Sequence, residues 1–515
     1  MGPRRGWLVL PGALLALSLA LTSCSSLPPL DGRVASTAIA DTDDTRLGKA
    51  LTPLTMADPG LAGIHALADG RDAFAARALL AQAADRSLDV QYYIWRNDTT
   101  GRLMFDALRR AAERGVRVRL LLDDNNTAGL DESLAALDAH PMIEVRLFNP
   151  NGIRSLRAVG MVADFMRLNR RMHNKSFTAD NQLTIIGGRN VGNEYFGAAG
   201  EISFADLDVI VAGPVVRAVS DDFDLYWNSP SAYPVELLAP DAAATPAWKP
   251  DAEAQVYMEA IRRSAFLEQL VEGSLPLEWA RARFVSDDPA KVMGTAVPEA
   301  NVAFKLRDIL GEPRRSLDLV SPYFVPGHEG TAAFVNLAKK GIRTRILTNS
   351  LEATDVAAVH AGYAKWRKPL LESGATLYEL RRDATDEPTR DQRGAGSGAG
   401  SRIGSSDASL HAKTFGVDGN RVFVGSFNFD QRSIHLNTEM GMVIDSPALA
   451  TRLTETLDRT LPTHAYEVKL DDRGSVIWLE RRGDQVIRHE TEPGTSWFKR
   501  AAVKALSWLP IDWLL

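Results

Sequence analysis

Two short motifs carry the same chemically useful side chains at the same spacing. Each motif has a histidine, a lysine two positions later and an aspartate five positions after the lysine. The two copies are His173, Lys175, Asp180 and His411, Lys413, Asp418. An asparagine follows at equal distance in both, because 190 − 173 = 17 and 428 − 411 = 17. One such motif can arise by chance, but two with matching surroundings indicate function.

This set of side chains suits phosphodiester exchange through a covalent intermediate. One imidazole can attack phosphorus, and the other can protonate the leaving alkoxide and then deprotonate the incoming alcohol. Ammonium, amide and hydroxyl groups can stabilise charge on the nonbridging oxygens. We therefore predict that both His-Lys-Asp sets are catalytic and that Asn190, Asn428 and Ser426 bind phosphate. The lysine pair supplies positive charge, so no metal or other cofactor is predicted.

Each histidine also needs a partner that orients its second ring nitrogen. Glu439 lies 28 positions after His411 (439 − 411 = 28), and Asp206 occupies the matching place in the first half. We predict that these two carboxylates orient the histidines.

The elements that position these motifs occur twice along the chain. β-rich runs open at Ser87 and Ser316, and helix-like stretches end at Gly115 and Gly341. Strand-like runs follow in each half, at 116–122 and 143–148 and again at 342–347 and 375–380. Helices that alternate with strands indicate α/β architecture, and the duplication indicates two similar lobes, each a mostly parallel sheet flanked by helices.

Composition and these repeats predict six parts in the chain of 515 residues. The expected parts are a signal peptide at 1–24, a tether at 25–60, a first lobe at 61–238, a connecting segment at 239–300, a second lobe at 301–465 and a C-terminal extension at 466–515. A Gly- and Ser-rich stretch at 393–406 precedes the second motif. It could be a lid over the site or a surface loop without function.

The N-terminus has the form of a bacterial lipoprotein signal. Arg4 and Arg5 precede an apolar run, and Leu-Thr-Ser stands directly before Cys24, the only cysteine. We expect the Cys24 thiol to carry a lipid that anchors the protein in the bacterial cell envelope, facing the periplasm, on the inner or outer membrane. The alternative is an uncleaved anchor. No later segment has about 18 uninterrupted apolar residues, the length of a membrane-spanning helix.

The net charge, the arginines before the first motif and the C-terminal residues all indicate what kind of partner the protein binds. The formal net charge of −6 argues against a nonspecific nucleic-acid binder. Arg167, Arg170 and Arg171 could attract lipid headgroups or form a solvated strand end. The last 20 residues mix aromatic and basic side chains, as in a helix that lies on a membrane surface or one that packs on the core.

The paired motifs resemble the phospholipase D superfamily, over roughly residues 60–515. Several stretches are similar to its cardiolipin synthase C family, namely 88–95, 122–126, 170–177, 360–364 and the closing Trp-Leu-Leu. The resemblance implies two phospholipase D-like lobes packed as a pseudo-twofold pair around one metal-independent site, with His173 as nucleophile and His411 as acid and base. It implies a phosphatidyltransferase that makes cardiolipin from phosphatidylglycerol and a donor such as phosphatidylethanolamine, at a membrane surface. The need for an accessory protein stays open.

Two other reactions use the same residues. Water could replace the alcohol, which would give phosphatidic acid by hydrolysis. The protein could also be a phosphodiesterase that acts on nucleic acid, but the acidic net charge and the lipoprotein signal disfavour this hypothesis.

Overall fold

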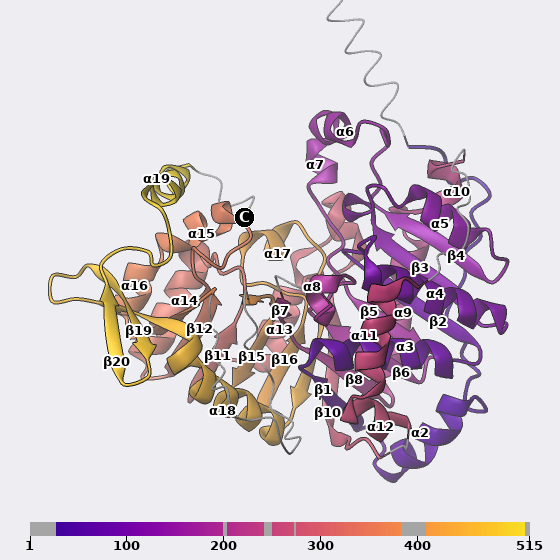
Figure 1. Cartoon of the computed structure of the whole chain (residues 1–515), viewed down its shortest axis with the longest axis horizontal. Coiled ribbons are helices and arrows are strands. Elements are labelled where there is room, and N and C mark those ends of the chain that lie inside the picture. The colour runs from indigo at the N-terminus through magenta and orange to yellow at the C-terminus, as the bar shows by residue number, and fades with distance from the viewer. Residues whose placement is uncertain (1–26, 199–202, 241–249, 272–273, 383–407, 510–514) are drawn as a thin grey trace, which may run out of the picture.

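Two lobes of similar architecture lie side by side in the computed structural model (Figure 1). The structure describes residues 27–198, 203–240, 250–271, 274–382, 408–509 and 515. The predicted signal peptide, its Cys24 and the Gly- and Ser-rich stretch at 393–406 lie outside these residues.

The first lobe is built on a sheet in the order β9-β4-β3-β2-β5-β6-β8-β1. Its strands are β1 (Ala62–Leu67), β2 (Ser87–Tyr92), β3 (Arg117–Asp123), β4 (Ile143–Phe148), β5 (Ser176–Ala179), β6 (Leu183–Gly187), β8 (Asp208–Ala212) and β9 (Ala232–Pro234). The predicted strands at 116–122 and 143–148 correspond to β3 and β4.

The second lobe repeats this order and extends it, as β10-β17-β16-β15-β11-β12-β13-β18-β19-β20. Its strands are β10 (Glu278–Ser286), β11 (Ser316–Val320), β12 (Arg343–Asn349), β13 (Thr376–Leu380), β15 (Thr414–Val417), β16 (Arg421–Gly425), β17 (Met440–Asp445), β18 (Ala465–Leu470), β19 (Val476–Arg482) and β20 (Gln485–His489). Since β1 pairs with β10, one continuous sheet of 18 strands runs through both lobes.

The expectation of mostly parallel sheets is wrong. Only β2, β3 and β4 in the first lobe, and β11, β12 and β13 in the second, run parallel. The strand inside each motif ends in a tight turn, at Asp180 and Asn181 (φ 50° and 51°) and at Asp418 (φ 57°). Such tight turns join antiparallel neighbours, whereas parallel neighbours need long crossovers.

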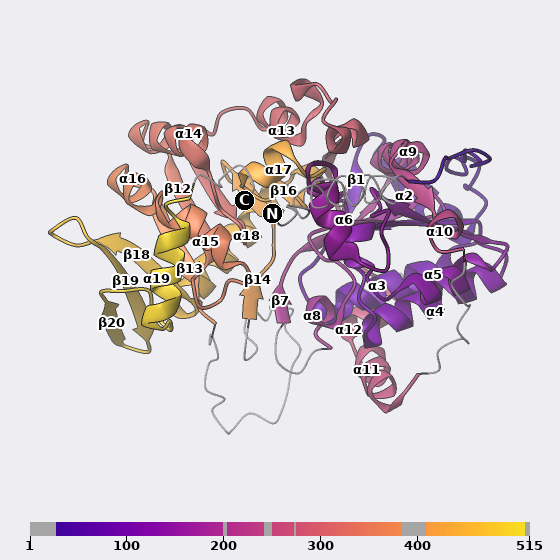
Figure 2. The ribbon, with the colours of Figure 1, turned by 90° about the horizontal axis from the view of Figure 1, so that it is seen from above.

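Helices cover both faces of the sheet (Figure 2). In the first lobe and the segment after it they are α2 (Arg46–Ala57), α3 (Gly70–Ala83), α4 (Thr99–Glu113), α5 (Asp131–Asp138), α6 (Arg157–Ala163), α7 (Phe165–Leu168), α8 (Asn193–Phe196), α9 (Val215–Asn228), α10 (Val235–Leu238), α11 (Ala252–Arg262) and α12 (Ala265–Val271). In the second lobe they are α13 (Val302–Leu310), α14 (Gly327–Lys339), α15 (Ala357–Ala364), α16 (Arg367–Glu372), α17 (Gln431–His435), α18 (Pro447–His464) and α19 (Trp497–Leu506). Short 3₁₀ turns lie at Asp124–Asn126, Pro289–Met293 and Pro298–Ala300.

Local sequence explains the crossover helices α4 and α14, which precede the second parallel strand of each lobe. The side chain of Asp98 accepts a hydrogen bond from the backbone of Gly101 and so caps the start of α4. The chain leaves α4 and α14 through Gly115 and Gly341, whose φ values are 92° and 77°. Glycine adopts this left-handed conformation without steric cost, so the helices end where the sequence predicted.

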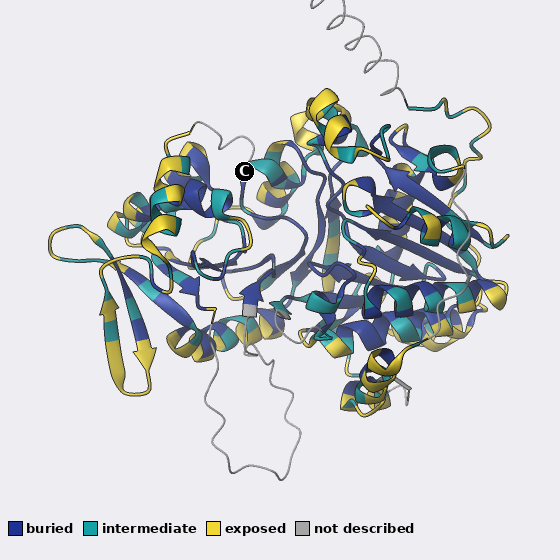
Figure 3. Ribbon diagram, turned by 45° about the horizontal axis from the view of Figure 1, so that its top comes forward, coloured by how far each residue is buried: buried dark blue, intermediate teal, exposed yellow. Residues whose placement is uncertain are grey.

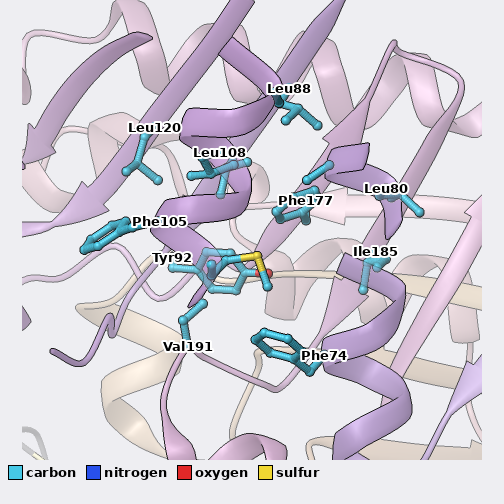
Figure 4. Packing of buried hydrophobic residues seen from close by; sticks show 14 of the residues in the cluster. Phe74, Leu80, Leu88, Tyr92, Phe105, Leu108, Leu120, Phe177, Ile185 and Val191 are labelled. Atoms are coloured by element: carbon cyan, nitrogen blue, oxygen red, sulfur yellow. The ribbon is translucent and has the colours of Figure 1, made fainter. Parts of the chain in front are cut away.

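Buried apolar side chains form one core in each lobe and a third core between them. The dark blue strands in Figure 3 are the buried ones, and Figure 4 shows the packing of Phe74, Tyr92 and Phe177 in the first core. The third core joins Ile186 and Val211 of the first lobe to Val424 and Met442 of the second. The lobes are therefore fixed to each other by packing as well as by the shared sheet.

Residues expected to be a free tether are fastened to the first lobe. Arg33 donates hydrogen bonds to the carbonyl oxygens of Asn228, Ser229 and Ala232 at 2.6–2.9 Å, and α2 follows at 46–57. The segment predicted as a connection contributes β10 to the sheet, and the predicted C-terminal extension contributes β18, β19 and β20. None of the helices within the described residues is long and apolar enough to span a bilayer.

Candidate active site

Each motif histidine is held against the other lobe by backbone hydrogen bonds. Met172 and Thr438 form an isolated parallel bridge, and the backbone N–H of His173 donates to the carbonyl of Thr438 at 2.9 Å. On the other side, β14 (Ala408–Leu410) pairs in parallel with β7 (Ser203–Ala205). The N–H of His411 then donates to the carbonyl of Ala205 at 2.9 Å. Both histidines thus lie at the junction of the lobes.

The carboxylates that contact the histidines are exchanged between the lobes. His173 Nδ1 of the first lobe lies 2.8 Å from Glu439 Oε2 of the second. His411 Nδ1 of the second lobe lies 2.6 Å from Asp206 Oδ2 of the first. An ionised carboxylate only accepts hydrogen bonds, so each Nδ1 carries the proton and each Nε2 keeps its lone pair.

The two lysines form a buried cationic pair beside the histidines. The ammonium of Lys175 donates to the carbonyl of His173, and that of Lys413 donates to the carbonyl of His411. Burial lowers the pKa of Lys413 to about 8 and lowers that of Lys175 well below its usual range, with the Lys413 charge adding to the effect. A bound phosphodiester anion would relieve this repulsion.

Burial also keeps both imidazoles neutral. It lowers the pKa of His173 well below its usual value, and the charges of Lys175 and Lys413 lower it further. For His411, burial and Lys413 lower the pKa to about 4, although Asp206 opposes them. Without a bound substrate, both rings are therefore neutral at pH 7.

The two orienting carboxylates differ in how firmly they stay ionised. Burial raises the pKa of Glu439 to about 7, against the opposing charge of Lys175. Burial would also raise the pKa of Asp206, but His411, Lys413 and Arg189 together hold it well below the usual range. The carboxylate beside His411 is therefore the more firmly ionised, which favours protonation of that ring.

The two motif aspartates, predicted to be catalytic, do not lie with the histidines and lysines. The carboxylate of Asp180 accepts hydrogen bonds from the backbone N–H groups of residues 85, 86 and 87 at 2.8–2.9 Å. That of Asp418 accepts from the backbone of residues 314, 315 and 316 at 2.7–3.1 Å. Five residues of extended chain span about 16 Å, so each aspartate lies at the far end of the strand from its lysine. Both fix the loop that leads into the first parallel strand.

The predicted phosphate ligands are mostly engaged elsewhere. The hydroxyl of Ser426 donates to Glu439 Oε2 at 2.5 Å. The Asn190 side chain accepts from the N–H of Ile94 and donates to the hydroxyl of Tyr195, both at 3.1 Å. Only Asn428 keeps a buried side-chain oxygen without a hydrogen-bond partner. Ser426 therefore positions Glu439, and Asn190 positions Ile94 and Tyr195.

Aromatic side chains that the sequence did not single out surround the two histidines. The ring of Tyr93 lies 5.0 Å from that of His173, and the rings of Tyr195 and Phe204 each lie 5.1 Å from that of His411. The hydroxyl of Ser433 also donates to Glu439 Oε1 at 2.8 Å. Period-two alternation after the buried Tyr92 could have placed Tyr93 on the site face, whereas no spacing marks the other three.

The arginines before the first motif are engaged in contacts within the protein. Arg167 pairs with Asp164 at 2.6 Å, and Arg171 pairs with Asp123 at 3.1 Å. Arg170 donates to the carbonyl of Lys291 at 3.0 Å. These contacts fix the chain that leads to His173.

A cavity of about 480 Å³ lies on the opposite side of the His411 segment. Its walls are largely apolar and include Leu410, Ala412 and Leu457, with Asp206 at one side. The two motif histidines and lysines do not line it, so it is not where the charged groups meet a phosphate. The matching space in the first lobe is filled by the buried rings of Phe223 and Trp227.

The geometry is that of a two-motif phosphodiester-exchange site, and comparisons with known proteins agree. The model of a family described as "Cardiolipin synthase, PLD-like domain" matches residues 77–227 and 306–461. The chain belongs to this family and is a phospholipase D-type phosphatidyltransferase.

Three relatives illustrate the range of similarity. Cardiolipin synthase C of Escherichia coli is 50% identical over 478 residues, which cover 91% of this chain and 100% of that protein. The major cardiolipin synthase of Bacillus subtilis is 25% identical over 399 residues, 77% of this chain and 68% of that protein. The crystal structure of phosphatidylserine synthase from Haemophilus influenzae has a TM-score of 0.57 at 15% identity, covering 91% of this chain and 100% of that one. This last similarity shows the shared fold.

Proposed function

We propose that this chain makes cardiolipin by transferring a phosphatidyl group from a donor such as phosphatidylethanolamine to phosphatidylglycerol. The observation that carries the proposal is the arrangement of two imidazoles, each oriented by a carboxylate of the other lobe, beside two buried lysines. The relatives named as cardiolipin synthases support the choice of product.

The two lobes act as an approximately twofold pair around one phosphorus atom. The bridge between Met172 and Thr438 has its counterpart in the pairing of β14 with β7, and the two histidine–carboxylate contacts match in the same way. These matching contacts support the proposal that both motifs face one common centre, which holds a single phosphate.

In the first step, Nε2 of His173 attacks the phosphorus of the donor. The bound phosphodiester anion adds negative charge beside His411, which therefore takes up a proton on Nε2 before the reaction. A P–N bond then forms, the P–O bond to the headgroup breaks, and His411 gives this Nε2 proton to the leaving oxygen. Lys175 and Lys413 stabilise the nonbridging oxygens. Burial keeps His173 neutral, as a nucleophile must be, and the firmly ionised Asp206 favours protonation of His411, the group that carries a proton.

In the second step, His411 takes the proton from a hydroxyl of the phosphatidylglycerol headgroup. That oxygen attacks the phosphorus, the P–N bond to His173 breaks, and cardiolipin leaves. Both histidines return to their starting state, so the cycle needs no cofactor.

The substrates place the reaction at a membrane. We propose that Cys24 is lipidated and that the protein faces the periplasm, on the basis of the Leu-Thr-Ser-Cys sequence at 21–24. Whether the enzyme also uses an accessory protein is a separate question that the test below addresses by purification.

The test is expression of the full chain in a bacterium that lacks cardiolipin, followed by lipid analysis. We expect cardiolipin to appear, and His173→Ala or His411→Ala to abolish it, while His140→Ala, which changes a histidine outside the site, leaves it unchanged. The purified protein incubated with labelled donor should carry an acid-labile, alkali-stable label at His173. Phosphatidic acid without cardiolipin would instead identify a hydrolase, and cleavage of DNA without lipid turnover a nuclease.

A further inference from the structure

Exposed apolar side chains concentrate on two short helical segments, one on each lobe. Within the described residues, nine of the 19 exposed large apolar side chains lie at 156–166 and 497–509. On the first lobe they are Leu156, Val159, Val162, Phe165 and Met166. On the second lobe they are Trp497, Phe498, Trp508 and Leu509. Surfaces that expose contiguous apolar groups usually meet a partner.

The two segments stand on the same side of the molecule. Figure 1 places α6 and α7 at the top of the first lobe and α19 at the top of the second. The view from above confirms that both face the same way, with α15 and α17 between them (Figure 2), and Figure 3 shows exposed residues on both. We call the nine side chains together the apical surface.

Each segment is held firmly by its inner side. Arg157 at the start of α6 pairs with Asp124 and Asp131 at 3.4 and 3.5 Å, and Gly160 lies so close that a Cβ there would be 2.0 Å from Asn151. In α19, Val503 packs against Leu351 and Ala361. The apolar side chains therefore point outward from anchored helices, and their exposure is not the result of loose packing.

The apical surface is directly connected to the reaction centre. The first motif histidine, His173, follows the end of α7 at Leu168 by five residues (173 − 168 = 5). The side chain of Arg432 in α17 donates to Asn169 Oδ1 at 2.9 Å and so ties this connection to the second lobe. A partner that covers both segments would also lie over α15 and α17, the helices between them (Figure 2).

We propose that the apical surface docks on a bilayer that contains anionic phospholipid and presents the site between the lobes to that bilayer. The inference extends the proposed function, because it names the surface through which the lipids arrive. Aromatic side chains interleaved with lysine and arginine are typical of elements that lie in the interfacial layer of a membrane.

Charge supports a lipid over a second copy of this acidic chain. The segment Trp497–Leu506 carries Lys499, Arg500 and Lys504 and no acidic residue, although the whole chain has a net charge of −6. Each basic side chain near an anionic leaflet favours binding.

The start of the described chain is consistent with this orientation. The ribbon begins on the side of the molecule that carries α6 (Figure 1). Eight residues, 25–32, separate Cys24 from Arg33, the first residue fastened to the lobe. They reach at most about 30 Å, so a lipid on Cys24 would keep this side near the membrane.

The first experiment places a fluorescent label on either side of the molecule. Cys24 is the only cysteine, so in a full-length Cys24→Ser background a single introduced thiol takes an environment-sensitive dye. Val162→Cys and Phe498→Cys test the apical surface, where the side chains are 82% and 78% exposed. Val256→Cys on α11 is the matched control, with 72% exposure.

We expect dye at 162 and 498 to shift to the blue and brighten when vesicles of phosphatidylethanolamine and phosphatidylglycerol are added, and dye at 256 to stay unchanged. Equal responses at all three positions, or none at any, would overturn the proposal. So would a change that needs only higher protein concentration, because that result would identify a second copy as the occupant.

The second experiment separates docking from chemistry. The double variant with Val162→Glu and Phe498→Glu should lower transfer between vesicle lipids by about tenfold or more, since it places charges in the interfacial layer. Transfer between short-chain lipids dissolved as monomers should be unchanged, as should both rates in Val256→Glu. Equal loss on both substrates would refute the docking role. If neither the parent protein nor any variant transfers a phosphatidyl group, the proposed function is wrong. The dye measurements still show whether the apical surface binds the vesicles.

Discussion

Asp206 of the first lobe lies 2.6 Å from the Nδ1 atom of His411 in the second lobe, and Glu439 makes the reciprocal contact with His173. Each lobe therefore contributes a histidine that only the other lobe orients. Asp206→Asn should lower kcat by roughly 10²–10⁴-fold, as loss of an orienting carboxylate does in other histidine relays. Steady-state transfer measured on dissolved short-chain lipid checks this, and Asp221→Asn, on the first lobe but outside these contacts, is the control. An Asp206→Asn enzyme with unchanged kcat would contradict the assignment.

Ser426 should act through Glu439. Its hydroxyl donates to that carboxylate and helps to hold down a pKa that burial raises to about 7. Ser426→Ala should therefore raise the pKa of Glu439 and shift the acid limb of the kcat profile to higher pH, with KM nearly unchanged.

The control is Ser373→Ala, whose hydroxyl only donates to the carbonyl of Leu370. If Ser426 were instead a phosphate ligand, its loss would raise KM and leave the acid limb in place.

The alkaline limit of activity should follow Lys413. Burial lowers its pKa to about 8, so the ammonium is charged below that pH and loses its charge as the pH rises through it. We expect kcat/KM for the anionic substrate to fall above pH about 8. Lys413→Arg keeps its charge to far higher pH, so the alkaline limb should disappear even if the rate at pH 7 is lower. An unchanged limb in Lys413→Arg would assign the fall to another group.

Asp418 should matter for stability and not for chemistry. Its carboxylate accepts hydrogen bonds from three successive backbone N–H groups at 314–316. Asp418→Ala should lower the free energy of unfolding by about 2 kcal/mol, since it leaves these donors without their partner.

Denaturant unfolding measures that loss, and kcat per folded molecule should stay within about twofold of the parent, in contrast to the loss expected on mutating a group that acts on the reacting atoms. A folded Asp418→Ala enzyme without activity would restore the aspartate to the chemistry.

The sequence predicted the order of elements well because local rules determine it. Gly115 and Gly341 end helices where expected, and the strand at 143–148 has the predicted bounds. The direction of the outer strands was missed, since it depends on the tight turns at Asp180 and Asp418 rather than on helix–strand alternation. Asp180 and Asp418 lie at those same turns and bind backbone N–H groups. The spacing of the motif alone does not reveal this structural role.

Within the site, the sequence predicted which carboxylates orient the histidines but not which histidine each carboxylate contacts. Spacing marks Asp206 and Glu439 as equivalent, but only the packing of β7 on β14 and the bridge of Met172 with Thr438 decide which histidine each one meets. Tyr195 and Phe204 come beside His411 for the same reason.

The pairing of β1 with β10 constrains how the enzyme can move. Ala62, Gly63 and Ile64 are hydrogen-bonded in register with Ala280, Trp279 and Glu278, so a clamshell opening of the two halves would have to tear a continuous ladder of backbone hydrogen bonds. We therefore expect the two halves of the site to keep their separation through the reaction, so that admission of the lipids does not depend on rotation of one lobe away from the other.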